Sequence, residues 1–231
     1  MDGIDGSGKG TIVDYFEQYF LQKGKKILDL KDYWRRKHTL PQPEDLKAYD
    51  LIISAEPTFS LVGLAIRDEI VRHNQRSYSA LATAQAFALD RFILYQRIII
   101  PALLAGKMVI QERGVTTSLV YQPIQKEALP LDKILSLEGN QLALKYQPDY
   151  LIVTVLDPQE AIRRLNKRKK KRDFAIFEKE KFLKQAQSRF KAAWFKNIFS
   201  RRGTRIFYLE TTGAKTENKA EAIRLLKRIK L

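Results

Sequence analysis

A glycine-rich run with one lysine opens the chain, and its spacing is suited to holding phosphates. Gly3, Gly8 and Lys9 have the G-x-x-x-x-G-K spacing of loops that cradle a nucleoside triphosphate. Glycines let the backbone turn tightly, so that its N–H groups converge on an anion at the start of a helix. The predicted nucleotide-binding residues are Gly3, Ile4, Asp5, Gly6, Ser7, Gly8, Lys9, Gly10 and Thr11.

The end of this motif departs from the strict pattern. Gly10 stands where Ser or Thr is usual, and Thr11 follows it, in the G-K-G-T form that nucleoside monophosphate kinases use. A lysine for the β and γ phosphates and a hydroxyl for the metal shell are both still present. Because a helical pattern follows at once, we favour a phosphate loop over a chance glycine-rich turn.

A buried strand normally precedes such a loop. Here only Met1 and Asp2 do, so we expect the first strand of the sheet to be missing. Our hypothesis is that Met1 is an internal residue of that strand and that a miscalled start removed the residues before it. An in-frame stop codon immediately upstream would refute this hypothesis.

Composition and charge limit the other classes of site. The 231 residues include no Cys and two His, which excludes disulfides and leaves no thiolate or histidine cluster for a metal. Apolar content of 45% fits one globular domain over residues 1–231. The longest apolar stretch, 92–105, is too short and too interrupted to span a membrane. With no signal peptide in view, we expect a cytoplasmic protein without membrane attachment.

The net charge of +16 calls for an anionic partner. Eight of the ten residues from Arg163 to Arg172 are Lys or Arg, a run that is often only solvated. Nucleotides, nucleic acid and an acidic membrane surface are all candidates at this point.

The elements that must position the loop alternate along the chain. The expected strands are 26–30, 51–55, 108–111, 150–156 and 205–209, and the expected helices are 11–23, 63–73, 79–105, 115–121, 131–145, a basic helix from 158, 178–199 and a C-terminal helix. Residues 35–47, with Pro41 and Pro43, read as a surface insertion. This alternation predicts a three-layer α/β/α fold on a mostly parallel sheet, the P-loop NTPase class.

Four further segments occur in the order found in one family. They are Glu56-Pro57-Thr58 with Ile66-Arg67, Phe87-Ala88-Leu89-Asp90-Arg91, the run from Glu112 to Gln122, and Tyr146-Gln147-Pro148-Asp149-Tyr150-Leu151. Together they resemble the E-P-x…R, F-x-x-x-R, D-R-Y-x-x-S-S-x-A-Y-Q and P-D-L segments of thymidylate kinases. The resemblance covers nearly the whole chain.

The resemblance implies a thymidine nucleotide site. Phe87 and Arg91 are four residues apart and share one helix face. In the family the ring stacks on thymine and the arginine donates to its 4-oxo group. Tyr121 corresponds to the aromatic beneath the sugar, and Ser118 and Gln122 to polar contacts near the base. A core phenylalanine with a surface arginine is the alternative.

The resemblance also implies acceptor-phosphate, metal and lid residues. Arg67 and Arg113 match phosphate clamps, a role that suits the forked guanidinium, and Glu56 belongs to the same substrate set. The expected Mg²⁺-associated residues are Asp5, Thr11 and Glu112. In this family, members whose loop lacks an arginine carry catalytic arginines in the lid, which corresponds here to residues of about 166–178. We therefore expect Arg168 and Arg172 to be catalytic lid residues. The other expected catalytic residues are Lys9, Asp5 and Arg113.

Two positions depart from the family pattern. Glu112 replaces an aspartate and Gly114 replaces an aromatic residue, so the carboxylate reaches one methylene further and a packing group is lost.

The expected function is transfer of the γ-phosphoryl of ATP to dTMP with Mg²⁺, and the resemblance implies a homodimer as an option. A kinase for another nucleotide or nucleoside remains an alternative. A nucleic-acid-associated ATPase or a non-catalytic binding protein ranks lower, because the basic residues concentrate at the expected lid.

Overall fold

The computed structural model describes residues 1–72, 74–167 and 180–229. Most of the expected lid, including Arg168 and Arg172, lies outside these residues.

Parallel strands form the centre of the molecule. They are β1 (Asp2–Gly3), β2 (Ile27–Asp29), β3 (Leu51–Ala55), β4 (Met108–Glu112), β5 (Tyr150–Val155) and β6 (Arg205–Glu210). Every strand pair is parallel, in the orders β2-β3-β4 and β1-β5-β6. All five residues of β3 are buried, as expected of a strand that is covered on both faces. The predicted parallel sheet is confirmed.

The first three residues lie between the two groups of strands. Asp2 and Gly3 pair with β5. The amino group of Met1 donates to the Gln111 carbonyl at 2.8 Å, and the Met1 carbonyl accepts from the Arg113 amide at 2.8 Å. We expected no strand here, and the structure has one of two residues whose second residue is the first glycine of the loop. The loop therefore leaves from the middle of the sheet.

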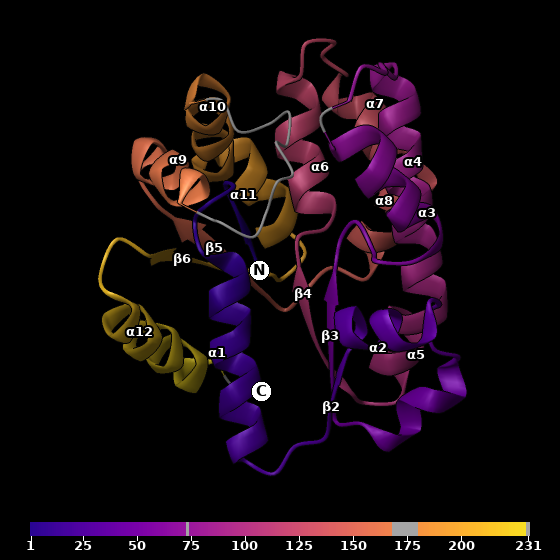
Figure 1. Cartoon of the computed structure of the whole chain (residues 1–231), viewed down its shortest axis with the longest axis vertical. Helices are drawn as coiled ribbons and strands as arrows, with labels where there is room; N and C mark the ends of the chain where they lie inside the picture. Colours follow the sequence, from indigo (N-terminus) through magenta and orange to yellow (C-terminus); the bar gives the residue numbers. More distant parts are fainter. Residues whose placement is uncertain (73, 168–179, 230–231) are drawn as a thin grey trace.

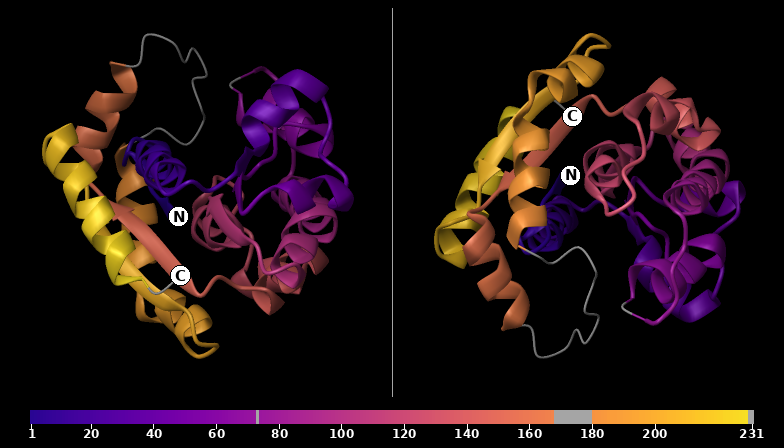
Figure 2. Two further views of the ribbon diagram at one scale, coloured as in Figure 1. Left: turned by 90° about the horizontal axis from the view of Figure 1, so that it is seen from below. Right: turned by 90° about the horizontal axis from the view of Figure 1, so that it is seen from above.

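Helices cover both faces of the sheet. They are α1 (Lys9–Gln22), α2 (Leu30–Lys37), α3 (Leu61–Ala65), α4 (Ala80–Leu94), α5 (Ile100–Leu104), α6 (Val115–Tyr121), α7 (Leu131–Ser136), α8 (Glu138–Lys145), α9 (Pro158–Asn166), α10 (Glu180–Lys191), α11 (Ala193–Ser200) and α12 (Lys215–Arg228). Helices α1 and α12 lie side by side, away from α3, α4 and α8 (Figures 1 and 2). Phe16 of α1 and Leu225 of α12 belong to one core, on one face of the sheet. Leu94 of α4 and Phe195 of α11 belong to a second core, which contains the strand residues whose side chains point to the other face. The three-layer α/β/α arrangement is thereby confirmed.

Several expected helices are interrupted. The helix expected over 79–105 passes through a π-helical stretch, Tyr95–Ile99, between α4 and α5. The one expected over 63–73 begins at Leu61 and continues as π-helical Ile66–Val71. Those expected over 131–145 and 178–199 each contain a break, between α7 and α8 and between α10 and α11.

The segment 35–47 is not a plain surface loop. Helix α2 starts at a cap in which the Asp29 side chain accepts from the Lys31 amide at 2.7 Å, and its last turn extends into this segment. A 3-10 helix, Pro43–Ala48, follows. Leu40 and Leu46 are buried in the core. Among the described residues, no helix has both the length and the apolar character needed to cross a membrane.

Candidate active site

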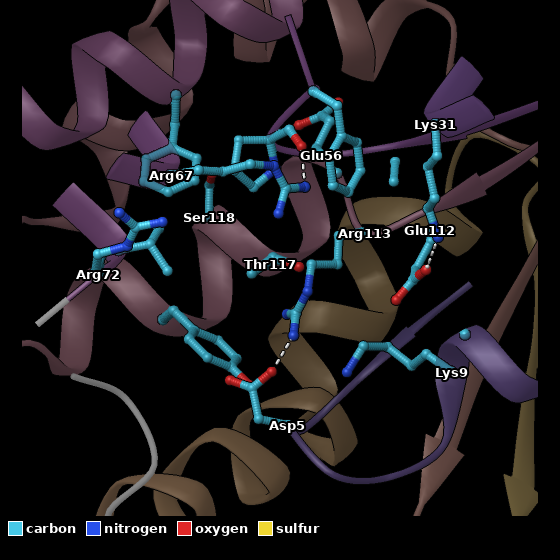
Figure 3. A pocket seen from close by; sticks show the side chains of 18 of the residues that line it. Asp5, Lys9, Lys31, Glu56, Arg67, Arg72, Glu112, Arg113, Thr117 and Ser118 are labelled. Carbon is cyan, nitrogen blue, oxygen red and sulfur yellow. Dashed lines mark hydrogen bonds and ion pairs between the residues drawn. The ribbon is translucent and has the colours of Figure 1, made fainter. Parts of the chain in front are cut away.

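One cavity of about 780 Å³ gathers residues from the phosphate loop and from three of the four further motif segments, all but Tyr146–Leu151. Figure 3 shows the loop residues Asp5 and Lys9 across from Glu56, Arg67 and Arg113. The predicted residues that line the cavity are Asp5, Gly6, Gly8, Lys9, Gly10, Glu56, Arg67, Phe87, Arg91, Glu112, Arg113, Ser118, Tyr121 and Gln122. Gly3, Ile4, Ser7 and Thr11 complete the loop but are not part of this lining.

The loop holds its lysine on its own carbonyl groups. Lys9 Nζ donates to the Gly3 carbonyl at 2.9 Å and to the Ile4 carbonyl at 2.7 Å. Gly8, with φ 86°, precedes the first turn of α1, a left-handed conformation that glycine adopts readily. Burial, with the nearby positive charge of Arg113, lowers the pKa of Lys9 to about 8. A buried ammonium therefore lies at the helix N-terminus, where phosphates bind.

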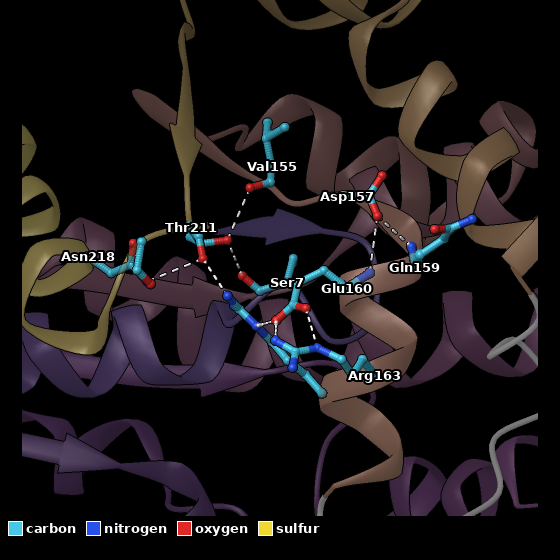
Figure 4. A network of polar contacts seen from close by, with 10 residues as sticks. Ser7, Val155, Asp157, Gln159, Glu160, Arg163, Thr211 and Asn218 are labelled. Atoms are coloured by element: carbon cyan, nitrogen blue, oxygen red, sulfur yellow. Dashed lines mark hydrogen bonds and ion pairs between the residues drawn. The ribbon is translucent and has the colours of Figure 1, made fainter.

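A second layer of contacts braces the loop from behind (Figure 4). Thr211 Oγ1 donates to the Ser7 carbonyl at 2.9 Å and to the Val155 carbonyl at 3.1 Å. The Thr211 carbonyl accepts from Arg164 Nη2 at 2.9 Å, and Arg164 also pairs with Glu160 at 2.9 Å. The sequence pattern did not identify Thr211 as part of the site, because it is far from the loop along the chain.

Helix α9 also contacts the loop directly. Gly6 has φ 81°, and a Cβ there would lie 2.5 Å from the Ala161 carbonyl oxygen. Any larger residue would displace either the loop or α9. The helix that leads toward the expected lid is therefore packed against the phosphate loop.

Asp5 and Arg113 form an ion pair across the cavity. Arg113 follows β4 with φ 65°, an uncommon conformation for a residue with a side chain. Burial would lower the pKa of its guanidinium, but Asp5 outweighs this effect and raises that pKa above its ordinary value. The Tyr121 ring lies 5.9 Å from the same guanidinium. Arg113 is thus a fixed cation between the loop and α6.

Arg91 is locked into a buried polar network. Its Nη2 lies 2.6 Å from Glu56 Oε2, and both side chains are almost inaccessible, at 1% and 3%. Arg91 also donates to Ser118 Oγ at 3.1 Å and to Asn140 Oδ1. Burial raises the pKa of Glu56, while the charge of Arg91 opposes that rise. Within the described residues Arg91 Nε is buried and has no hydrogen-bond partner. Asn140 was not found from the sequence.

Arg67 is held against the cavity wall by the chain before it. Its Nε donates to the Thr58 carbonyl at 2.9 Å, its Nη2 donates to the Pro57 carbonyl, and its guanidinium lies 3.6 Å from the centre of the Phe59 ring. Asp90 of α4 accepts from the Thr58 amide at 2.7 Å and from its hydroxyl at 2.6 Å. The backbone that fixes Arg67 is therefore anchored to the helix that carries Phe87.

Glu112 lies over the first turn of α1. A Cβ at Gly10 would lie 3.6 Å from Glu112 Oε2, and Lys31 Nζ lies 2.9 Å from the same oxygen. Burial would raise the pKa of Glu112, but Lys31, Lys9 and Arg113 outweigh it and hold that pKa at about 2. Lys31 and Arg35, both of α2, line the cavity and were not predicted.

The residues present fit a Mg²⁺ ion that takes most of its ligands from phosphates and water. The described residues contain no group of three or more His, Cys, Asp or Glu side chains able to hold a metal, so a dedicated protein cage is not expected. Mg²⁺ bound with a nucleotide needs only one or two carboxylates. Glu112 and Asp5, both at the loop, meet that need, whereas Thr11 is exposed.

The comparisons with known proteins agree with this geometry. The thymidylate kinase family model matches residues 44–219. The probable thymidylate kinase of Pyrococcus horikoshii is 31% identical over 173 residues, 73% of this chain and 69% of that protein. The corresponding protein of Thermococcus kodakarensis is 29% identical over 199 residues, 81% of this chain and 82% of that protein.

A bacterial relative gives a similar result. The thymidylate kinase of Thermoanaerobacter sp. (strain X514) is 28% identical over 169 residues, 73% of this chain and 70% of that protein. The family match spans most of the chain and includes α4, β4 and α6, which carry the residues around Arg91 and Arg113. This chain therefore belongs to the thymidylate kinase family.

Proposed function

We propose that this protein transfers the γ-phosphoryl group of ATP to dTMP, giving dTDP and ADP. The observation that carries the proposal is a single cavity in which a phosphate loop faces the Arg91–Glu56 pair and the Phe87 side chain. In the reaction a phosphate oxygen of dTMP bonds to the γ phosphorus, and the bond from that phosphorus to the β–γ bridging oxygen breaks. Bound Mg²⁺ would neutralise charge on the β and γ phosphates.

The loop binds the donor. Backbone N–H groups of Gly3 to Thr11 surround the phosphates, and Lys9 turns from the loop carbonyls to the β and γ oxygens. Asp5, Thr11 and Glu112 are the proposed metal-shell residues. Because the metal shell is mostly phosphate and water, we assign these side chains to orienting that water.

The opposite wall binds the acceptor. Arg67 and Arg113 hold the dTMP phosphate in line with the donor, since a guanidinium can bind two oxygens at once. Phe87 stacks on the base, and Arg91 donates to the 4-oxo group. Ser118 and Gln122 line the base end, and Tyr121 lies beneath the sugar.

Other parts of the expectation remain predictions. These predictions are the catalytic role of the lid residues Arg168 and Arg172, a single domain over residues 1–231, a homodimer and a cytoplasmic location. The absence of a nucleic-acid partner is a further prediction of this kind.

A substrate panel tests the proposed function. Purified protein with ATP and Mg²⁺ is offered dTMP, dUMP, dCMP, AMP or GMP, and ADP release is measured. We expect the highest kcat/KM with dTMP. Turnover of AMP without turnover of dTMP would overturn the proposal.

A pair of α4 variants tests the base site within the same assay. Base–aromatic stacking contributes roughly 1–3 kcal/mol, so Phe87→Ala should raise KM for dTMP about 5- to 150-fold. Leu89→Ala, at an exposed position of the same helix, is the matched control and should leave KM unchanged. Equal KM values for the two variants would contradict stacking on Phe87.

A further inference from the structure

Helix α2 brings an additional cation to the cavity. The family match begins at residue 44, so α2 (Leu30–Lys37) lies outside it. Lys31, in the first turn of α2, nevertheless lines the cavity beside Lys9 and Glu112. Figure 3 shows the Lys31 ammonium directed at the Glu112 carboxylate.

The strand order explains how two distant residues meet. Helix α2 follows β2, and β3 lies between β2 and β4. Neighbouring strands are about 4.8 Å apart, so a contact from α2 to the end of β4 must cross two strand spacings. The long side chains of Lys31 and Glu112 together cover that distance and leave Nζ 2.9 Å from Oε2. Aspartate at position 112 would be one methylene shorter.

The pair is also held on both sides. Asp29 Oδ1 accepts a hydrogen bond from the Lys31 amide at 2.7 Å, and this cap fixes the Lys31 backbone. The Lys31 and Glu112 side chains are 23% and 18% exposed, so water competes only partly for the ion pair. Glu112 itself lies over Gly10, at the start of α1. Lys31 thus pairs with a carboxylate that lies at the N-terminal end of α1, beside the phosphate loop.

We propose that Lys31 is a resident counter-ion for Glu112 that competes with the divalent cation for this carboxylate. Without metal, the ammonium neutralises Glu112. When a metal nucleotide binds, Glu112 is shared between Lys31 and the metal's water shell, which weakens metal binding and makes it reversible. Lys31 is therefore a positioning residue, and this role rests on the proposed function only in that the nucleotide enters at the loop.

Mn²⁺ binding to the protein–ADP complex tests the proposal, with the free ion followed by electron paramagnetic resonance. Lys31→Met should lower the Kd of Mn²⁺ about fivefold, the scale of one partly exposed ion pair. Lys31→Arg keeps the charge and should remain close to wild type. Lys37→Met removes an equal charge from an exposed position of the same helix and should have a much smaller effect.

A second background isolates the pair. In Glu112→Gln protein, Lys31→Met should no longer change the Mn²⁺ Kd, because the carboxylate for which Lys31 competes is gone. ADP binding in EDTA should be the same for wild type and Lys31→Met. Unchanged or weaker Mn²⁺ binding in folded Lys31→Met would overturn the proposal.

ADP binding in EDTA provides a second result that could overturn the proposal. Weaker ADP binding in EDTA, with an unaltered Mn²⁺ Kd, would assign Lys31 to the nucleotide phosphates and would equally overturn it. Circular dichroism confirms that each variant is folded. Since the readout uses Mn²⁺ and ADP without dTMP, failure here is distinguishable from failure of the substrate panel.

Discussion

At the residue scale, the Arg91–Glu56 pair is the most deeply buried charged contact in the cavity wall, among the ion pairs of the described residues. Removing one partner of a buried pair leaves the other charge without compensation, at a cost of about 3–5 kcal/mol. We expect Glu56→Gln to lower the free energy of unfolding by about 3 kcal/mol, measured by urea denaturation. Glu69→Gln, which breaks the exposed pair with Arg76, is the control and should leave the curve unchanged.

Lys9 supplies a pH-dependent prediction. Its pKa of about 8 in the free protein should rise when phosphates replace part of its lost hydration. At pH 8 nucleotide binding should therefore take up about half a proton, and affinity should fall as the pH rises further. Calorimetry at pH 8 in buffers with different ionisation enthalpies measures the uptake.

Lys9→Arg is the control for this measurement. Arginine keeps its proton throughout this range, so the part of the uptake due to position 9 should vanish. Equal proton uptake by the wild-type protein and Lys9→Arg would show that another group titrates.

Residue types, spacing and the family resemblance were sufficient to find the loop and half of the residues that line the cavity. Phe87 and Arg91, four apart on α4, were predicted from spacing and family resemblance, and both line the cavity. Asn140 and Lys31 were not found, because nothing local marks them. Each acquires its role through a contact with a residue far along the chain, and such contacts follow from the folded sheet.

At the scale of elements, the connection after β6 links the phosphate loop to α9. Thr211 is 1% exposed, and its hydroxyl shares one proton between the Ser7 and Val155 carbonyls. Thr211→Val keeps the shape but leaves the Ser7 carbonyl without that donor, at a cost of about 1–3 kcal/mol, whereas the Val155 carbonyl still accepts from the backbone amide of residue 211. We expect weaker ADP binding and lower stability, measured by calorimetry and urea denaturation.

The adjacent residue provides the control for the Thr211 variant. Thr212 is exposed, so Thr212→Val should change neither quantity. Unaltered ADP affinity in Thr211→Val would mean that the loop keeps its shape without this brace.

Element types were predictable where the apolar pattern was continuous, and less so where tertiary contacts decide. The buried run of β3 was read correctly from sequence. The π-helical stretch Tyr95–Ile99 was not, since α-helical and π-helical turns carry nearly the same apolar pattern. The 35–47 segment reads as polar, and its buried Leu40 and Leu46 become core residues only when the segment packs against the Tyr95–Ile99 stretch and α5.

At the scale of the whole molecule, the cavity spans two groups of strands. The loop leaves β1, in the β1-β5-β6 group, whereas Glu56 and Arg113 follow β3 and β4 of the other group. The backbone hydrogen bonds of Met1 to Gln111 and Arg113 join these groups. A ligand that contacts both walls of the cavity therefore also links the two groups of strands.

A bisubstrate analogue, adenosine and thymidine joined through five phosphates, tests this coupling. A ligand at 100 times its Kd stabilises the folded state by about 2.7 kcal/mol, which corresponds to a Tm increase of roughly 5–10 °C for a chain of this size. Because the analogue reaches both walls, hydrogen exchange should slow in β1 and β5 and also in β3 and β4. ADP alone, at the same multiple of its Kd, should protect mainly the loop, β1 and β5. If ADP alone protected β3 and β4 as strongly as the analogue does, the two groups of strands would already behave as one cooperative unit, and linkage through the ligand would be refuted.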